Sequence, residues 1–153
     1  MSFDFVVMGA TGMQGRIAAR DLLENGHSVL LCGRDKKRID HLLRRFSKIK
    51  FDYLDARNIS EMSKVFRSSG ASTVVNCVEG DWNLNVLNAC IAAGVHCIDL
   101  GSEIPMTKKQ LALHRTLKRK KLTHITGCGS VSGIGNVMLN HAAQKYDSLH
   151  SIE

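Results

Sequence analysis

Short apolar runs alternate with stretches of helical periodicity along the whole chain. Each apolar run predicts a strand, and the third alternates polar and apolar residues, which favours an edge position in a sheet. The predicted strands are Phe5–Met8, Ser28–Cys32, Phe51–Asp55, Thr73–Cys77, Val95–Asp99 and His124–Thr126.

Between these strands, apolar residues recur three and four positions apart, as on the buried face of a helix. Asp35 and Ser60 are placed to cap helices at their N-terminal ends, and Gly26 and Gly94 are placed to end them. His141 falls on the apolar face of the last helix, which predicts a core histidine. The residues that carry the helical pattern are Met13–Glu24; Ile39, Leu42, Leu43 and Phe46; Met62, Val65 and Phe66; Leu84, Leu87 and Ile91; Leu111 and Leu117 within Thr107–Lys121; and Ile134, Val137, Met138, His141 and Ala142.

Strands that alternate with helices of this length imply right-handed crossovers and a parallel sheet with helices on both faces. The chain has 153 residues, which fits one domain. We therefore predict an α/β fold over residues 1–153: a doubly wound parallel sheet of Rossmann type, with six strands in the order 3-2-1-4-5-6.

The turn after the first strand is rich in glycine and opens a helix. Gly9 permits the tight turn, Gly12 lets backbone approach a pyrophosphate, and Gly15 lets the helix pack on the strand. The spacing is G-x-x-G-x-x-G, because Thr11 and Gln14 occupy two of the usual glycine positions. Such a turn can be only a connection, but as the first βα turn of a six-stranded sheet it favours cofactor binding. The residues expected at the cofactor phosphates are Gly9, Thr11, Gly12, Met13 and Gln14.

The end of the second strand favours NADP over NAD. An NAD-binding domain usually has an acidic residue there for the ribose 2′-hydroxyl, but this strand ends in Gly33 and Arg34. Arg34 can grip a 2′-phosphate with two hydrogen bonds, and Lys37 or Arg38 can add charge. Asp35 lies one residue late for the ribose and fits a helix cap better. The alternative is a solvent-exposed helix start.

Other strand ends supply further candidates. Asp55 follows the third strand and can bind the adenine amino group or begin a turn; both interpretations remain open. Asn76, Cys77 and Val78 end the fourth strand beside the topological switch point, where the nicotinamide ribose is expected to pass. A buried thiol is favoured over a catalytic role for Cys77. Trp82 fits a cover for the opening of the fourth helix, or a lining of the cofactor crevice.

Several catalytic patterns are missing from the sequence. Neither tyrosine is followed by lysine four positions later, as in short-chain dehydrogenases, because Tyr53 leads to Arg57 and Tyr146 to His150. Val131 stands at the centre of the Gly129–Gly133 stretch, so this stretch is not a nucleophile elbow. No clustered Cys/His spacing indicates a metal site. The sequence therefore assigns no catalytic residue.

Charge and cysteine usage narrow the class of protein. The formal net charge is +7, with basic residues gathered in segments 34–50 and 115–121. Aromatic residues make up 5% of the chain and are not interleaved with these clusters, so nucleic-acid binding is not favoured. The chain has five cysteines without a Cys-x-x-Cys pair, no signal peptide, and no apolar run near the roughly 20 residues that cross a bilayer. We expect a soluble cytoplasmic protein without a membrane partner.

The segment from Asn76 to Asp99 resembles the fourth βαβ unit of saccharopine dehydrogenase-like reductases. It begins with the strand end Asn-Cys-Val, continues through a helix with the pattern V..AC..AGVH over Val86–His96, and closes on a strand that ends in aspartate. Segments 9–34 and 127–136 fit as well. Thr11 and Gln14 depart from the family's loop and match atypical short-chain reductases and NmrA-like proteins. Residues 131–133 stand where the family has a proline-glycine pair.

This resemblance implies an NADP-dependent oxidoreductase that acts on an amino-acid-like C–N bond. In that family a second, mixed α/β domain follows the cofactor domain and forms the substrate pocket. The chain then corresponds to the N-terminal cofactor domain of a longer enzyme whose C-terminal substrate domain is absent, or to a chain that has lost that domain, with the catalytic residues mostly elsewhere. The alternatives are a non-catalytic NADP(H) sensor of the NmrA-like kind and an atypical short-chain reductase relative. A homo-oligomer is compatible with each.

Overall fold

A computed structural model describes residues 2–78, 80–101, 103–148 and 151. It contains a six-stranded sheet in the order β3-β2-β1-β4-β5-β6 with every pairing parallel, which confirms the predicted doubly wound α/β fold. Strand β3 lies at an edge, as its alternating pattern predicts. The strands are β1 (Phe5–Met8), β2 (Val29–Gly33), β3 (Ile49–Tyr53), β4 (Thr73–Asn76), β5 (His96–Asp99) and β6 (His124–Ile125).

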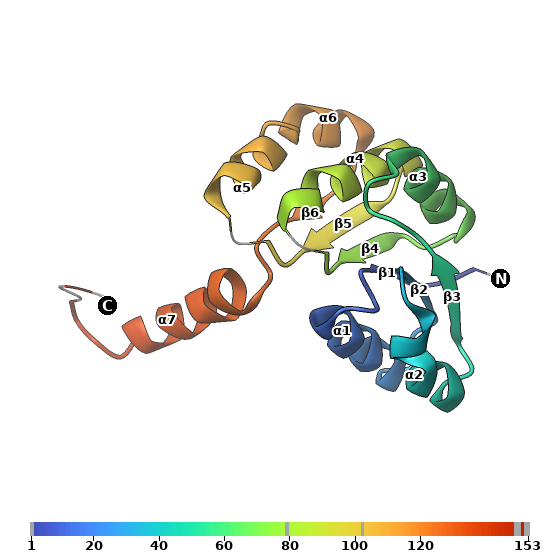
Figure 1. The fold of residues 1–153 in the computed structure, drawn as a ribbon. Coiled ribbons are helices and arrows are strands. Elements are labelled where there is room, and N and C mark those ends of the chain that lie inside the picture. The colour runs from blue at the N-terminus through green and yellow to red at the C-terminus, as the bar shows by residue number, and fades with distance from the viewer. Residues whose placement is uncertain (1, 79, 102, 149–150, 152–153) are drawn as a thin grey trace.

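Helices cover both faces of the sheet, with α1 and α2 on one face and α3 and α4 on the other (Figure 1). Helix α7 projects away from the body of the domain. Among the residues that the structure describes, no helix is long and apolar enough to cross a membrane. The helices are α1 (Met13–Glu24), α2 (Asp40–Arg45), α3 (Ile59–Ser68), α4 (Asn83–Ala93), α5 (Ile104–Leu111), α6 (His114–Lys120) and α7 (Asn136–Ala143).

The core has two layers because side chains along a strand point alternately to opposite faces. Val6 of β1 packs with Phe66 of α3 and Leu87 of α4. Val7 points the other way and packs with Ile39, just before α2. Strand β1 is therefore buried on both faces, and this fixes the place where the following turn begins.

The structure divides the helix predicted over Thr107–Lys121 into α5 and α6. Helix α5 begins earlier, with Pro105 in its first turn, and the chain turns at Ala112. Leu111 was predicted in the core and is 60% exposed, whereas Gln110 is buried. The cause is a hydrogen bond from the Gln110 amide to the buried Asp99, which turns a polar side chain inward in a way that an apolar pattern cannot reveal.

The predicted helix ends are confirmed except for one N-cap. Asp35 caps a single 3₁₀ turn before α2, and Gly94 ends α4 in the left-handed conformation. Ser60 was the wrong cap, because α3 begins one residue before it. The Asn58 side chain caps α3 instead by accepting a hydrogen bond from the Glu61 N–H at 3.0 Å.

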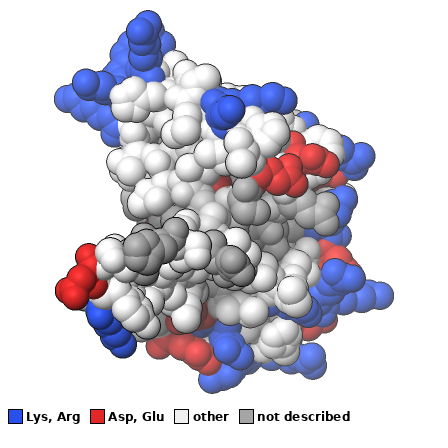
Figure 2. Space-filling model, turned by 90° about the vertical axis from the view of Figure 1, so that its left-hand side faces the viewer, with Lys and Arg blue, Asp and Glu red and all other residues white. Residues whose placement is uncertain are grey.

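Helix α7 has the predicted periodicity but packs against no layer of this domain. None of its eight residues is buried, and the predicted core residue His141 is exposed. The apolar stripe of Ile134, Val137 and Met138 faces outward, with Met138 65% exposed. In Figure 2 the face toward which α7 projects is largely uncharged, with Lys and Arg gathered toward its edges. The apolar pattern identified the helix correctly, but the described residues of this domain leave its apolar stripe exposed.

Candidate functional site

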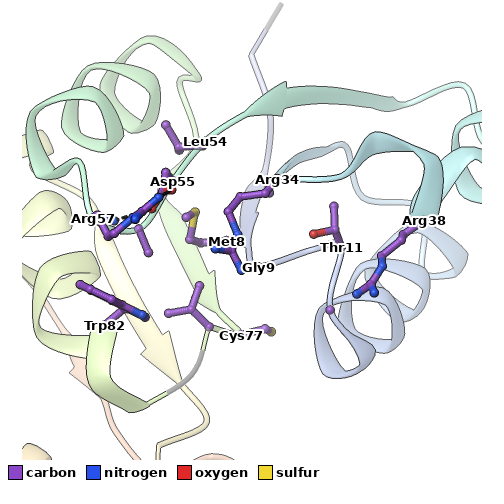
Figure 3. Close-up of a pocket in the computed structure, with 14 residues that line it drawn as sticks. Met8, Gly9, Thr11, Arg34, Arg38, Leu54, Asp55, Arg57, Cys77 and Trp82 are labelled. Carbon is purple, nitrogen blue, oxygen red and sulfur yellow. Dashed lines mark hydrogen bonds and ion pairs between the residues drawn. The ribbon is translucent and has the colours of Figure 1, made fainter.

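A cavity of about 320 Å³ opens at the C-terminal ends of β1, β2 and β4. This is the end of a doubly wound sheet at which ligands bind, beside the point where the strand order reverses. Eight of the twelve candidate residues line it, and Figure 3 shows several of them. These eight are Gly9, Thr11, Gly12, Gly33, Arg34, Asp55, Cys77 and Val78.

The glycines of the first turn have different structural roles. Gly9 has a φ of +81°, and a Cβ there would lie 2.8 Å from the Cys77 carbonyl carbon, so both backbone shape and space require glycine. A Cβ at Gly15 would lie 2.7 Å from the Ala10 Cα, so α1 can approach β1 only without a side chain. Gly12 begins α1 in extended conformation, and its Cβ would meet only the Gly9 carbonyl oxygen, at 3.2 Å. The fold thus requires Gly9 and Gly15 more strictly than Gly12.

Gly33 is fixed by a contact that the sequence did not reveal. Gly33 is buried, and a Cβ there would lie 2.7 Å from both the methyl and the hydroxyl of Thr11. Thr11 therefore fills the space that an acidic side chain at the end of β2 would need. An NAD-type carboxylate cannot stand at this position unless Thr11 moves.

Two arginines follow Gly33 on the exposed side of the cavity. Arg34 and Arg38 both line it, whereas Lys37, the other basic candidate, does not (Figure 3). Asp35 accepts a hydrogen bond from the Lys37 N–H at 3.1 Å, and its other oxygen lies 3.5 Å from the Arg38 Nε. Asp35 therefore serves as the cap that its position predicts. An exposed pair of this kind contributes little, so Arg38 can turn toward an anion.

Asp55 forms the turn after β3 and holds Arg57 in place. Its carboxylate accepts a hydrogen bond from the Arg57 N–H at 2.9 Å and pairs with the guanidinium at 2.6 Å. These hydrogen bonds hold the pKa of Asp55 at about 2. Arg57 and Trp82 also line the cavity. Arg57 was not among the residues predicted for the site, although an arginine two residues after a turn-forming aspartate was the available signal.

Cys77 lines the cavity, whereas Asn76, the residue before it, does not. Asn76 is buried, donates to the Asn83 side chain at 2.8 Å and accepts from the Val78 N–H at 3.1 Å. It therefore fixes the chain where β4 ends. Burial raises the pKa of the Cys77 thiol to about 12. The thiol therefore stays protonated near neutral pH and is a poor nucleophile.

A second cavity of about 260 Å³ adjoins the first and shares Cys77 and Val78 with it. Gln14 lies here rather than in the first cavity, and Met13, which is 67% exposed, lines neither. The other described residues of its wall are Gly80 and, from the turn after β5, Leu100, Gly101 and Glu103.

Behind this second cavity lies a cluster of buried polar side chains around Asp99, which we call the Asp99 cluster. It consists of Asp99 at the end of β5, Gln110 of α5, His124 of β6 and Thr126. Burial alone would raise the pKa of Asp99, but hydrogen bonds to its carboxylate outweigh burial and lower the pKa to about 2. The sequence analysis gave Asp99 no role beyond ending a strand.

Comparison with known proteins identifies a family. Residues 5–125 match the model of the saccharopine dehydrogenase NADP binding domain. The carboxyaminopropylagmatine dehydrogenase of Synechocystis sp. is 27% identical over an alignment of 158 positions, gaps included, which covers 97% of this chain. The chain spans 40% of the length of that relative.

Solved structures show the same fold. The saccharopine dehydrogenase (L-Glu forming) of Saccharomyces cerevisiae superposes with a TM-score of 0.77 at 16% identity, over 94% of this chain and 31% of that one. The triphenylmethane reductase of Citrobacter sp., in complex with NADP(H), gives 0.60 at 20% identity, over 80% of this chain and 48% of that one.

The Asp99 cluster generates a prediction about acid stability. A carboxylate whose pKa falls from an ordinary 3.8 to about 2 on folding stabilises the protein above pH 4, and this stabilisation is lost as the pH falls toward 2. Urea unfolding at a series of pH values should show this loss, with a smaller slope for Asp99→Asn. Asp55→Asn is the variant to compare with Asp99→Asn, because the pKa of Asp55 is also held at about 2. An Asp99→Asn protein with the slope of the unaltered chain would contradict the prediction.

Proposed function

The chain belongs to the family of saccharopine dehydrogenase NADP-binding domains, and on that premise we propose that it is the cofactor domain of a dehydrogenase acting on an amino-acid-like C–N bond. NADP is the cofactor of this family. One observation carries the placement of that cofactor: β2 ends in Gly33, where the Thr11 side chain occupies the space that a Cβ would need, while Arg34 and Arg38 line the same cavity. A cavity edge with two guanidinium groups and no carboxylate at the strand end favours a 2′-phosphate.

The remaining parts of the cofactor follow from this position. The turn from Gly9 to Gly12 would hold the pyrophosphate, because the N–H groups that begin α1 face it and Gly12 brings no side chain. The adenine would lie toward Arg57 and Trp82, which line the same cavity. The nicotinamide half would pass Cys77 and enter the second cavity. When bound, NADPH supplies the hydride, and the residues of this chain bind and orient it.

We further propose that residues 1–153 form the N-terminal part of a longer enzyme with a separate substrate domain. The chain covers 40% of the cyanobacterial relative and 31% of the yeast structure. The stripe of Ile134, Val137 and Met138 on and before α7 is exposed, and an apolar stripe of this kind is normally buried against another element. A substrate domain packed on α7 would cover it and supply the catalytic residues.

Replacing Arg34 tests the choice of cofactor. In the unaltered chain NADPH should bind more tightly than NADH, because only NADPH offers a 2′-phosphate. Arg34→Ala should weaken NADPH binding by about 1.5–3 kcal/mol, the range for a charged hydrogen-bonded contact, and leave NADH nearly unchanged. Titration calorimetry and the fluorescence of Trp82, the single tryptophan, give both affinities.

The matched variant is Arg44→Ala, which removes the same charge from an exposed position of α2 outside the cavity. It should leave both affinities unchanged. Equal affinity of the unaltered chain for NADPH and NADH would contradict the assignment of the 2′-phosphate site.

Replacing Gly12 tests the phosphate-binding turn. A Cβ here would meet only the Gly9 carbonyl oxygen, at 3.2 Å, and Gly12 lines the cavity in front of α1, so a valine side chain is expected to enter that space. Gly12→Val should therefore abolish NADPH binding in a folded protein, as measured by thermal denaturation and NADPH titration. Gly15→Val, which presses on the Ala10 backbone, should lower stability first. A folded Gly12→Val protein with unchanged NADPH affinity would place the phosphates elsewhere.

Turnover tests the division of the enzyme into two parts. The 153-residue chain should bind NADPH but not oxidise it in the presence of imines or of keto-acid and amine pairs, because on this proposal the groups that hold substrate against the nicotinamide belong to the separate substrate domain. The measurement is NADPH absorbance over time with a panel of such pairs, against a control without substrate. Oxidation well above that control would show that the chain carries its own substrate site.

A further inference from the structure

We propose that Asp99 is a positioning residue for the nicotinamide half of the cofactor. Its side chain accepts hydrogen bonds from the turn after β5, which lines the second cavity, and from the turn after β6, which packs against that first turn. This inference rests on the proposed position of NADP(H). The Asp99 carboxylate is buried and lines neither cavity. Its effect on the ligand would therefore be indirect and confined to the nicotinamide end.

One oxygen of Asp99 joins two separate turns. Its Oδ1 accepts hydrogen bonds from the Gly101 N–H at 2.9 Å and from the Gly127 N–H at 3.2 Å. Gly101 belongs to the turn after β5, and Gly127 follows β6. The Thr126 hydroxyl lies 3.2 Å from the same oxygen and 3.3 Å from the Gln110 Oε1, and it can donate its single hydrogen to either. A single carboxylate oxygen therefore accepts hydrogen bonds from both turns.

The other oxygen anchors the carboxylate to its surroundings. Oδ2 accepts hydrogen bonds from the Gln110 amide and the His124 Nε2, each at 2.7 Å. Asp99 is fully buried and Gln110 is 1% exposed. A buried charge is tolerated only when it is fully hydrogen-bonded, so the position of the carboxylate is strictly determined.

The two turns also pack backbone against backbone. A Cβ at Gly129 would lie 2.6 Å from the Leu100 carbonyl oxygen, and the Ser132 hydroxyl donates to the Gly101 carbonyl at 3.3 Å. The Cys128 N–H donates to the Asp99 carbonyl at 2.8 Å. Residues 127–132 therefore support the backbone of residues 100 and 101, and Asp99 fixes the distance between the two segments.

Among the described residues, the turn after β5 lines the second cavity and not the first. Leu100, Gly101 and Glu103 line the second cavity, and none of them is among the residues that line the first. The first cavity is formed by the ends of β1, β2 and β4 and by the turn after β3. Movement of the turn at Gly101 should therefore disturb the nicotinamide half and leave the adenosine half in place.

Two ligands separate the halves. Adenosine 2′,5′-bisphosphate reports on the adenosine half alone, and NADPH reports on both, with the fluorescence of its reduced nicotinamide as a direct signal of that end. Asp99→Ala removes all five hydrogen bonds. It should raise the NADPH dissociation constant about tenfold, change that of the bisphosphate less than about twofold, and reduce the fluorescence enhancement of bound NADPH.

The matched control is Ser69→Ala, which removes a buried hydroxyl that donates to the Phe66 carbonyl near the N-terminal end of β4. It should lower stability without changing the ratio of the two affinities. If Asp99→Ala does not fold, Thr126→Val is measured in its place. It keeps the side-chain shape and removes the hydroxyl beside Oδ1. It should shift the ratio in the same direction by about threefold.

The outcomes distinguish this inference from the proposed function. A variant that weakens both ligands equally, or neither, overturns the role of Asp99. An unaltered chain that binds NADPH no better than the bisphosphate also overturns it, because the second cavity then holds nothing. An unaltered chain that binds neither ligand contradicts the proposed cofactor site itself.

Discussion

The structure depends on the close approach of three backbone segments at Gly9. The end of β1 is paired with β2 and β4, and the turn that leaves it passes against the Cys77 carbonyl on one side and α1 on the other. No side chain fits at Gly9 or Gly15. Because the turn is held this closely, α1 begins at the mouth of the cavity, and the ends of β2 and β4 are set on either side of it.

The sequence predicted the sheet well because buried parallel strands are short apolar runs separated by helical periodicity. It failed where a contact between distant residues overrides local pattern. Gln110 turns inward because Asp99 is there to accept its hydrogen bond, so Leu111 turns outward. His141 was predicted in the core because an apolar stripe shows that a helix face will be covered but not which part of the protein covers it.

The same limit applies to the candidate site. Local spacing predicted the glycine turn and Arg34, and these do meet at one cavity. It could not choose between Lys37 and Arg38, because that depends on how the short helical turn after Asp35 is oriented. It did not identify the Asp99 cluster either, because Asp99, Gln110 and His124 lie on three different elements and only the folded sheet brings them together.

The contact between Thr11 and Gly33 has a consequence for how the preference for one nucleotide can evolve. An acidic residue at position 33 collides with Thr11 unless that side chain moves or is replaced by a smaller one. The two positions are therefore epistatic: a lineage that exchanged NADP for NAD by this route would need both substitutions, with an intermediate that is strained or indifferent. At the proposed cofactor site, the choice of coenzyme would then depend on the contact between Thr11 and Gly33 as well as on Arg34 and Arg38.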